Sequence, residues 1–197
     1  MRVLVACEYS GTVRDAFIAR GHDAMSCDLL PTEKPGPHYQ GDVRDVIGNE
    51  WDMAVCHPPC TRLCNSGVAW LEKRNLWGDL SEAAAFFRLF LECDIERVAI
   101  ENPIPHKYAM KLIGRRYDQV IQPWWFGHGE TKATCLWLKN LPPLISTGAA
   151  TGRSQRLHRL PPGPERARER SRTYPGIANA MAEQWGSMIY ESTLKPL

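Results

Sequence analysis

Short apolar runs alternate with helix-like segments along this chain, and no other feature of the sequence restricts the fold as strongly. The apolar runs are typical of buried strands, and they end at Cys7, Asp28, Cys56 and Asn102. Residues 11–21, between the first two runs, carry apolar side chains at helical spacing. Strands that alternate with helices form parallel sheets whose two faces are covered. The pattern predicts an α/β fold with a mostly parallel sheet and helices on both faces.

The remaining elements follow from similar patterns and from helix and turn signals. Helix 80–93 is the clearest, with Asp79 and Ser81 as its expected caps. Residues 41–46 indicate a strand end or a turn around Asp42. Further helices are expected at 106–114 and 176–189, and further strands within 118–126 and 133–139.

The size and composition of the chain are those of one soluble domain. Its 197 residues suit a single catalytic domain over 1–197, and 44% of them are hydrophobic against 23% charged. No apolar run approaches the ~20 residues that cross a bilayer. Charged Glu8 and Arg14 follow the short N-terminal run too closely for a signal peptide. Seven cysteines without regular spacing favour reduced thiols in the cytoplasm over a disulfide framework.

Arginine is concentrated in one proline-rich segment. The chain has a net charge of +2, but residues 152–172 hold seven arginines and two glutamates, or +5, which leaves −3 for the rest. A local arginine stripe is typical of a surface that binds phosphate. The expected nucleic-acid contacts are Arg153, Arg156 and Arg159, together with Arg62 in another loop. The alternative is a solvated surface loop without a partner.

Polar residues follow the predicted strands at their carboxyl ends, where open α/β sheets bind their ligands. These groups are Glu8, Ser10 and Gly11, then Asp28, then Asp42, then Cys56 to Cys60, and then Glu101 with Asn102. The sequence therefore predicts that several loops meet at one site. Asp28 has the spacing of a carboxylate that holds ribose hydroxyls, but without a GxGxxG motif a dinucleotide site is poorly supported.

The stretch CHPPCTRLCNSG, Cys56 to Gly67, is open to several interpretations. We expect no metal, because Pro58 and Pro59 stiffen the link between the candidate zinc ligands. A redox pair is disfavoured because no C-x-x-C is present. Buried, inert cysteines in a turn are the remaining structural alternative. Cys60 is the best placed for reactivity, because it follows a predicted strand through two prolines and lies in a loop with a nearby cation.

Glu101 supplies the acid–base partner that a cysteine nucleophile needs. It leaves a predicted strand in the sequence IENP, with Asn102 beside it to orient it. We therefore interpret Cys60 and Glu101 as a functional pair rather than a structural one.

HPPCTRLCNSG resembles the nucleophile motif of the DNA cytosine-5 methyltransferases, with Cys60 on the nucleophile and Gly67 on the glycine. IENP resembles the Glu-Asn-Val motif of that family, with Glu101 on the catalytic glutamate and Asn102 on the asparagine. ACEYSGTVRDAFIARGHDAMSCDL and GDVRDV look like the family's cofactor motif and Gly-Asp element. YPGIANAMAEQW looks like its late helix, with Asn179 on the asparagine. These stretches stand in the family's order across almost the whole chain.

The resemblance implies a Rossmann-like fold that uses S-adenosyl-L-methionine to methylate C5 of cytosine in DNA. The implied cofactor-binding residues are Glu8, Tyr9, Ser10, Gly11, Asp28, Leu29, Asp42, Val43, Pro58 and Asn179. Cys60 would add to C6 of the base while Glu101 stabilises the charge that develops at N3 and the exocyclic amine. Asn102 and Lys132 complete the implied catalytic set. A base stacked in duplex DNA is out of reach, so the target is flipped or single-stranded.

Departures from the family keep other functions open. Tyr9 stands where the cofactor motif usually has a glycine. The Gln-x-Arg-x-Arg motif is replaced by Glu130, Lys132 and Thr134, so only Lys132 keeps the charge. The Pro- and Arg-rich loop at about 146–173 is too small for the usual target-recognition region, although it can grip phosphates. The alternatives are a related enzyme that modifies a free pyrimidine nucleotide and a catalytically idle DNA-binding protein.

Overall fold

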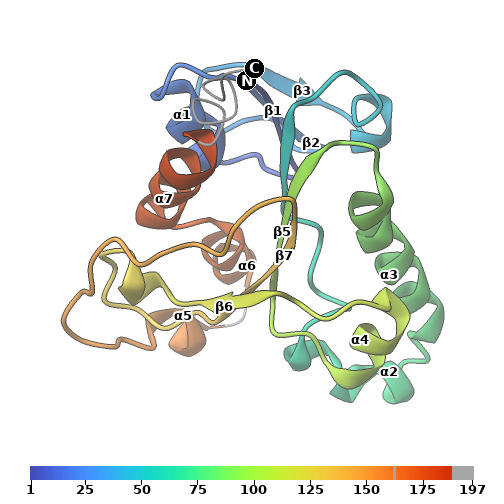
Figure 1. Cartoon of the computed structure of the whole chain (residues 1–197). Coiled ribbons are helices and arrows are strands. Elements are labelled where there is room, and N and C mark those ends of the chain that lie inside the picture. Colours follow the sequence, from blue (N-terminus) through green and yellow to red (C-terminus); the bar gives the residue numbers. More distant parts are fainter. Residues whose placement is uncertain (162, 188–197) are drawn as a thin grey trace.

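The computed structural model of the chain describes residues 1–161 and 163–187 and holds a seven-stranded sheet (Figure 1). The strand order is β3-β2-β1-β4-β5-β7-β6. The first five strands pair in parallel, whereas β7 runs antiparallel between β5 and β6. The strands are β1 (Arg2–Ala6), β2 (Asp23–Asp28), β3 (His38–Gln40), β4 (Met53–Cys56), β5 (Arg97–Pro103), β6 (Gln119–Ile121) and β7 (Thr134–Lys139).

Helices cover both faces of the sheet, as the sequence predicted. The helices are α1 (Thr12–Ile18), α2 (Ala69–Lys73), α3 (Trp77–Glu92), α4 (Lys107–Ile113), α5 (Arg156–Arg159), α6 (Pro164–Ser171) and α7 (Pro175–Gly186). Short 3-10 helices are η1 (Val43–Asp45), η2 (Asn65–Gly67) and η3 (Pro123–Trp125). α1 and α7 pack on one face, and α3 and α4 pack on the other (Figure 1). Within the described ranges, no helix has the length and apolar character needed to cross a membrane.

The order β3-β2-β1-β4-β5 is that of a Rossmann-like doubly wound sheet, which confirms the predicted fold class. The chain builds outward from β1 in one direction and then, from β4, in the other. Ligands of such sheets bind outside the carboxyl ends of the strands that flank this switch point. Ala6 at the end of β1 is in register with Cys56 at the end of β4. The loops that follow these two strands therefore start side by side.

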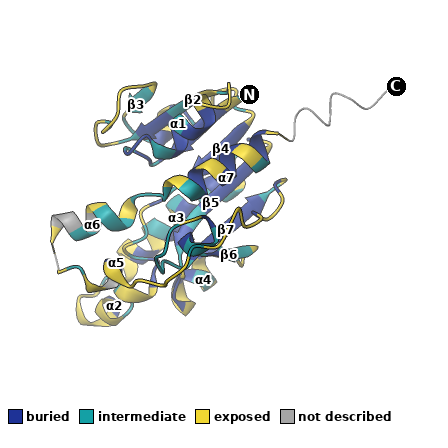
Figure 2. Cartoon of the chain, turned by 90° about the vertical axis from the view of Figure 1, so that its left-hand side faces the viewer, coloured by how far each residue is buried: buried dark blue, intermediate teal, exposed yellow. Residues whose placement is uncertain are grey.

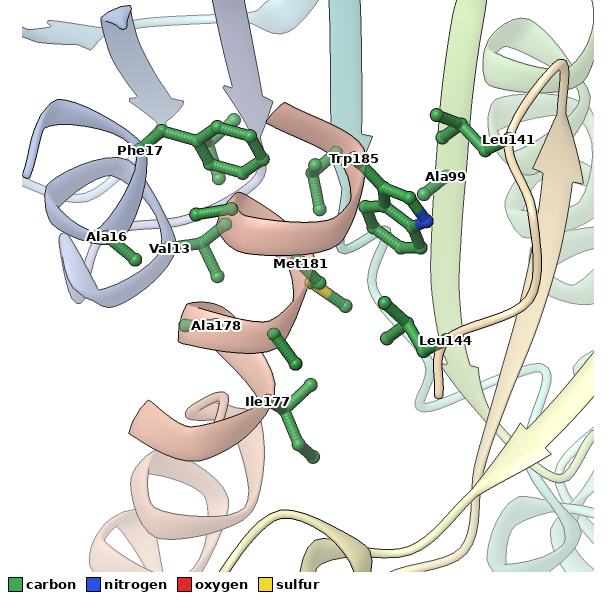
Figure 3. Packing of buried hydrophobic residues seen from close by; sticks show 14 of the residues in the cluster. Val13, Ala16, Phe17, Ala99, Leu141, Leu144, Ile177, Ala178, Met181 and Trp185 are labelled. Atoms are coloured by element: carbon green, nitrogen blue, oxygen red, sulfur yellow. The ribbon is translucent and has the colours of Figure 1, made fainter. Parts of the chain in front are cut away.

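The face under α1 and α7 is a closely packed apolar layer (Figure 3). Trp185 of α7 is fully buried, and Figure 3 shows its indole beside Ala99 and Leu144. The indole N–H donates to the carbonyl oxygen of Pro142 at 3.0 Å, so the polar edge of the ring is also satisfied. Because truncating a large buried side chain costs about 3–5 kcal/mol, this layer holds α7 firmly against the sheet.

The opposite face is built around aromatic contacts between α3 and the antiparallel strand β7. Phe87 packs edge-on against Trp137, with 4.8 Å between the ring centroids. The Trp137 indole N–H donates to the carbonyl oxygen of Arg115 at 2.9 Å. Figure 2 shows the buried residues concentrated along the strands, whereas α2 and α5 are largely exposed. The rigid core therefore lies in the sheet, and the loops at its carboxyl edge are free to form a site.

Two elements begin or end where the sequence did not predict. α3 begins at Trp77, so Asp79 and Ser81 lie inside the helix and are not its caps. Ser81 Oγ donates instead to the carbonyl oxygen of Trp77 at 3.0 Å. β6 ends at Ile121, well short of residue 126, because Pro123 begins η3 and cannot donate to a strand ladder.

The segments around residues 41–46 and 146–173 adopt more local structure than a loop. Asp42 caps η1, accepting a hydrogen bond from the backbone N–H of Arg44 at 2.9 Å, so the turn interpretation of 41–46 is confirmed. α5 and α6 lie within 146–173. The helix predicted for 176–189 corresponds to α7, and its last predicted residues, 188 and 189, lie outside the described residues.

Candidate active site

The loops after β1, β4 and β5 enclose a cavity of about 930 Å³, which we call the main cavity. Its walls include most of the residues expected to bind cofactor near the first strand and all but one of those expected to be catalytic. These are Glu8, Tyr9, Ser10, Pro58, Cys60, Glu101 and Lys132. The prediction that several strand ends would meet is therefore matched in the structure by one concave surface.

Cys60 is held by a loop that the prolines force out of the sheet. His57 makes the last ladder contact of β4, donating its backbone N–H to the carbonyl oxygen of Ala6 at 2.9 Å. Pro58 and Pro59 have no N–H, so pairing ends there. The backbone N–H of Cys64 then donates to the carbonyl oxygen of Cys60 at 2.9 Å, which closes a helical turn.

This turn is tied to the chain that follows β5. The backbone N–H of Asn65 donates to the carbonyl oxygen of Ile104 at 3.2 Å, and that of His106 donates to Leu63 at 3.0 Å. The buried His106 side chain contacts the carbonyl oxygen of Arg62 at 2.9 Å through Nε2. These contacts connect the loop of Cys60 to the strand of Glu101, and so they bring the two predicted catalytic residues together.

Cys60 and Cys64 share a proton in the main cavity. The Cys60 thiol donates a hydrogen bond to Cys64, which raises the pKa of Cys60, and burial and the Glu101 charge raise it further. The same hydrogen bond lowers the pKa of Cys64, helped by contacts with Ser66 and by the charge of Arg170. Ser66 Oγ lies 3.1 Å from Cys64 Sγ. In the ligand-free cavity, the negative charge of this pair therefore resides on Cys64.

Glu101 is a buried carboxylate whose partner is His57. Burial alone would raise the pKa of Glu101, but the His57 hydrogen bond and the Lys132 charge outweigh it and hold the pKa below its usual value. The distance between His57 Nδ1 and Glu101 Oε2 is 3.4 Å. Glu101 is therefore ionised in the empty cavity.

Asn102 and Lys132 contact different groups from those expected. Asn102 is fully buried and donates its side-chain N–H to the carbonyl oxygen of Pro103 at 2.6 Å. Since neighbouring residues of a strand point to opposite faces, it does not orient Glu101. Lys132 lines the main cavity and donates to the carbonyl oxygen of Arg172 at 3.0 Å. The residue that orients Glu101 is His57, which the sequence reasoning missed.

A smaller cavity of about 280 Å³, which we call the side cavity, adjoins the main one. Four predicted cofactor residues line it: Asp28, Leu29, Asp42 and Val43. Phe86 of α3 closes it, although nothing in the sequence marked this residue. Cys7 and Pro59, which follow β1 and β4, line both cavities. The two spaces therefore meet at the switch point of the sheet.

The carboxylates of the side cavity are oriented by backbone groups. Asp28 Oδ1 accepts a hydrogen bond from the backbone N–H of Leu30 at 2.9 Å, and burial raises the pKa of Asp28. Asp42 Oδ2 accepts from Arg44 Nη1 at 2.8 Å. Each oxygen can accept more than one hydrogen bond, so both carboxylates retain capacity for a ligand.

The loop between β1 and α1 uses Glu8 for its own structure. The Glu8 carboxylate is 4% exposed and accepts from the backbone N–H of Val13 at 2.8 Å and from Ser10 Oγ at 2.9 Å. It thus serves the first turn of α1, where negative charge is favourable. Cys7 and Gly11 have positive φ angles of 58° and 69°, which bend the loop sharply. Tyr9 instead reaches across the main cavity, where its hydroxyl lies 3.0 Å from Ser171 Oγ.

Two predicted cofactor residues lie outside both cavities. Gly11 is buried at the start of α1, and Asn179 is exposed on α7. Neither lines the main or the side cavity. Their expected contacts with a cofactor remain predictions.

The arginines expected to contact nucleic acid are largely engaged by the protein. Arg62 pairs with Asp79 at 3.1 Å. Arg153 stacks on Trp124, with Cζ 3.8 Å from the ring centroid. Arg156 pairs with Glu130 at 3.1 Å and with Glu169 at 3.3 Å. Arg159 is exposed, and none of the four lines the main cavity.

The arginines of α6 are arranged differently. Arg166 and Arg170 line the main cavity, and the described side chains offer neither of them a carboxylate partner. Arg168 and Arg172 bind Glu33, at 2.7 Å and 2.6 Å. α6 is thus anchored by one pair of arginines while another pair faces the cavity. Sequence reasoning placed the whole stripe in one loop and missed this division.

The cysteines and acidic residues show no metal-site arrangement in the part of the chain that the structure describes. No group of three or more His, Cys, Asp and Glu side chains could hold a metal ion there. All seven cysteines are described, and each is a free thiol.

No family model matches the chain, and no curated protein matches it. Solved structures do match. A protein described as a DNA modification methyltransferase, encoded within a prophage of E. coli, is 16% identical with a TM-score of 0.45, covering 70% of this chain and 46% of that one. The methyltransferase EhMeth of Entamoeba histolytica is 14% identical with a TM-score of 0.47, covering 83% and 60%. The Dnmt2 methyltransferase of S. pombe is 15% identical with a TM-score of 0.47, covering 75% and 52%. This chain spans about half the length of these proteins.

Proposed function

We propose that this protein transfers a methyl group from S-adenosyl-L-methionine to C5 of cytosine in DNA, through a covalent adduct with Cys60. The observation that carries the proposal is the meeting of Cys60 and Glu101 in one cavity at the switch point of the sheet. A thiol and a carboxylate that converge from neighbouring strands can act on two positions of one pyrimidine ring.

The side cavity supports the choice of cofactor. An adenosine group needs an apolar slot for the base and acceptors for its amine and ribose hydroxyls, and the side cavity offers both. Leu29, Val43 and Phe86 form the slot, and Asp28 and Asp42 supply the acceptors. When bound, S-adenosyl-L-methionine supplies the electrophilic methyl group that an activated C5 takes up.

The residues of the main cavity supply the activation. The Cys60 sulfur forms a bond to C6 of cytosine, and the electron pair of the C5–C6 double bond moves onto C5. Ionised Glu101 accepts a hydrogen bond from the exocyclic amine, and after protonation it donates to N3. Once C5 carries the methyl group and has lost its proton to a base, the double bond re-forms and the C6–sulfur bond breaks. Cys60 is then released as a thiolate.

Arg166 and Arg170 support a nucleic-acid substrate. They stand four residues apart on α6, so they share one helix face, and both line the cavity that holds Cys60. Their side chains lack a described carboxylate partner, which leaves the guanidinium groups available for phosphate. A target nucleotide in the cavity would bring its flanking phosphates to this pair. Phosphate contacts of this kind position DNA without reading its sequence.

Transfer of a radiolabelled methyl group tests the proposal directly. We expect label in duplex or single-stranded DNA that contains cytosine, and none in DNA without it. Cys60→Ser should abolish transfer while leaving cofactor binding nearly unchanged. Cys93→Ser is the matched control, because Cys93 lies at the end of α3, outside both cavities. Label in deoxycytidine monophosphate but not in DNA would identify a free nucleotide as the substrate.

An oligonucleotide with 5-fluorocytosine tests the covalent step. Fluorine at C5 cannot leave as a cation, so the adduct with Cys60 should persist and be visible as a protein–DNA species on a denaturing gel. The species should be absent with Cys60→Ser and present with Cys93→Ser. Full methyl transfer by Cys60→Ser would remove Cys60 from the mechanism.

A further inference from the structure

A second thiol, Cys64, lies one helical turn beyond Cys60 in the same cavity. The backbone hydrogen bond from Cys64 N–H to the Cys60 carbonyl oxygen, at 2.9 Å, fixes this turn. Both residues line the main cavity, and Cys64 is 6% exposed. The side chains are joined by a hydrogen bond in which the Cys60 thiol donates and Cys64 accepts. Cys64 therefore touches the reacting sulfur itself.

Cys64 is held in place on several sides. Ser66 Oγ lies 3.1 Å from its sulfur, and its backbone forms an isolated bridge with Pro105. Arg170 of α6 provides positive charge on the cavity side. Hydrogen-bond donors and a nearby cation are the surroundings that stabilise a thiolate.

The other charged groups around Cys60 do not serve as acceptors of its proton. Lys132 of β7 and Arg170 of α6 are cations with donors only. Glu101 of β5 raises the pKa of Cys60 through its charge, and its own carboxylate is bonded to His57. The proposed chemistry also needs Glu101 at the base edge of the pyrimidine. Among the described residues, this leaves Cys64 as the group in hydrogen-bond contact with the thiol.

We propose that Cys64 is the proton acceptor that activates Cys60. The role in methyl transfer rests on the proposed function, whereas the proton transfer itself needs neither cofactor nor DNA. As Cys60 attacks, its S–H proton moves to the Cys64 thiolate, and the freed electron pair of Cys60 forms the bond to C6. When the C6–sulfur bond later breaks, its electron pair returns to Cys60, which takes the proton back from Cys64. Protons and charge are conserved over the cycle.

Alkylation with iodoacetamide tests the proposal without substrate, with each modified cysteine identified by peptide mass spectrometry. In the wild type, the initial rate at Cys60 should be nearly independent of pH between about 6.5 and 8, because the pair has already lost one proton. In Cys64→Ala, Cys60 becomes an ordinary buried thiol, and its rate should rise about tenfold per pH unit over the same range. At pH 7 the rate should fall at least about tenfold relative to the wild type.

Cys64→Ser separates proton transfer from packing. Serine keeps a hydrogen-bonding group of similar size, but its hydroxyl does not hold an anion at neutral pH. We expect this variant to follow Cys64→Ala, whereas a purely structural role would be rescued by serine. Cys93→Ala is the matched control and should leave the Cys60 profile unchanged. A tenfold rise per pH unit at Cys60 in the wild type, or an unchanged profile in both Cys64 variants, would overturn the proposal.

Turnover distinguishes this proposal from the proposed function. If the protein methylates DNA, Cys64→Ser should lower kcat by about 10²–10⁴, the usual contribution of a positioned base, with cofactor affinity unchanged. A wild-type kcat and pH profile in Cys64→Ser would refute the role of Cys64. If alkylation behaves as expected but the wild type methylates no pyrimidine, the proposed function fails and the proton acceptor stands.

Discussion

The imidazole of His57 lies against the carboxylate of Glu101, with 3.4 Å between Nδ1 and Oε2. The two side chains are 8% and 14% exposed, so water contributes little to the stability of the charged carboxylate. This contact links the first residue after β4 to the strand β5. It keeps ionised a group that burial would otherwise protonate.

His57→Ala should raise the pKa of Glu101, because burial is then opposed mainly by the Lys132 charge. The native pKa lies below the ordinary value of 4.5, so Glu101 adds stability above that pH and loses it as the pH falls through the native pKa. In the variant, this contribution should shrink or change sign. Urea unfolding at a series of acidic pH values measures it. His22→Gln, distant from the cavity, is the control, and a pH dependence equal to wild type in His57→Ala would show that the contact does not set the pKa.

Asp28→Asn should weaken binding of S-adenosyl-L-methionine. Loss of a hydrogen bond to a charged group costs about 1.5–3 kcal/mol, which corresponds to about 10- to 150-fold in Kd. Calorimetric titration of the free protein with the cofactor measures the change without DNA. Asp23→Asn is the matched control, since Asp23 is exposed at the other end of β2 and lines neither cavity. Equal affinities in the two variants would exclude the side cavity as the cofactor site.

Replacing both Arg166 and Arg170 by alanine should weaken DNA binding and reduce its salt dependence. Each lost phosphate contact lowers the slope of log K against log salt by about 0.9 on duplex DNA, so the double variant should lose nearly two. Fluorescence anisotropy at several salt concentrations gives both quantities. Arg116→Ala removes a positive charge elsewhere, beside Tyr117 at the opposite edge of the sheet. If Arg153, Arg156 and Arg159 carry the contacts instead, their triple alanine variant will show the loss and the α6 variant will not.

Much of the site was predictable because it depends on topology. In a parallel sheet the strand ends that carry Glu8, Asp28, Cys60 and Glu101 must share one edge, whatever the details of packing. The direction of β7 was not predictable, because alternation of apolar and polar residues is the same for a parallel and an antiparallel strand. This strand nevertheless delivers Lys132 to the cavity.

The roles that sequence reasoning missed depend on side-chain geometry across distant elements. His57 reads as one more residue before the prolines until β5 places Glu101 beside it. Arg156 and Arg170 are equivalent in composition, but the register of α6 turns one to the cavity while Glu130 and Glu169 bind the other. Side-chain partners of this kind are set by tertiary packing, which local patterns do not encode.

Arg14→Ala should destabilise the protein and weaken cofactor binding together, because this fully buried arginine organises the chain after β2. Its guanidinium donates to the hydroxyl of Thr32 at 3.2 Å and to the carbonyl oxygens of Lys34 and Pro35, each also at 3.2 Å. Removing one member of a buried charged network costs about 3–5 kcal/mol, which urea unfolding should detect. The same segment carries Glu33, which anchors α6, so proteolytic cleavage within α6 should also become faster. Arg20→Ala, on the exposed end of α1, is the control; a variant of Arg14 with lower stability but unchanged cleavage of α6 would show that the segment and the helix are not coupled.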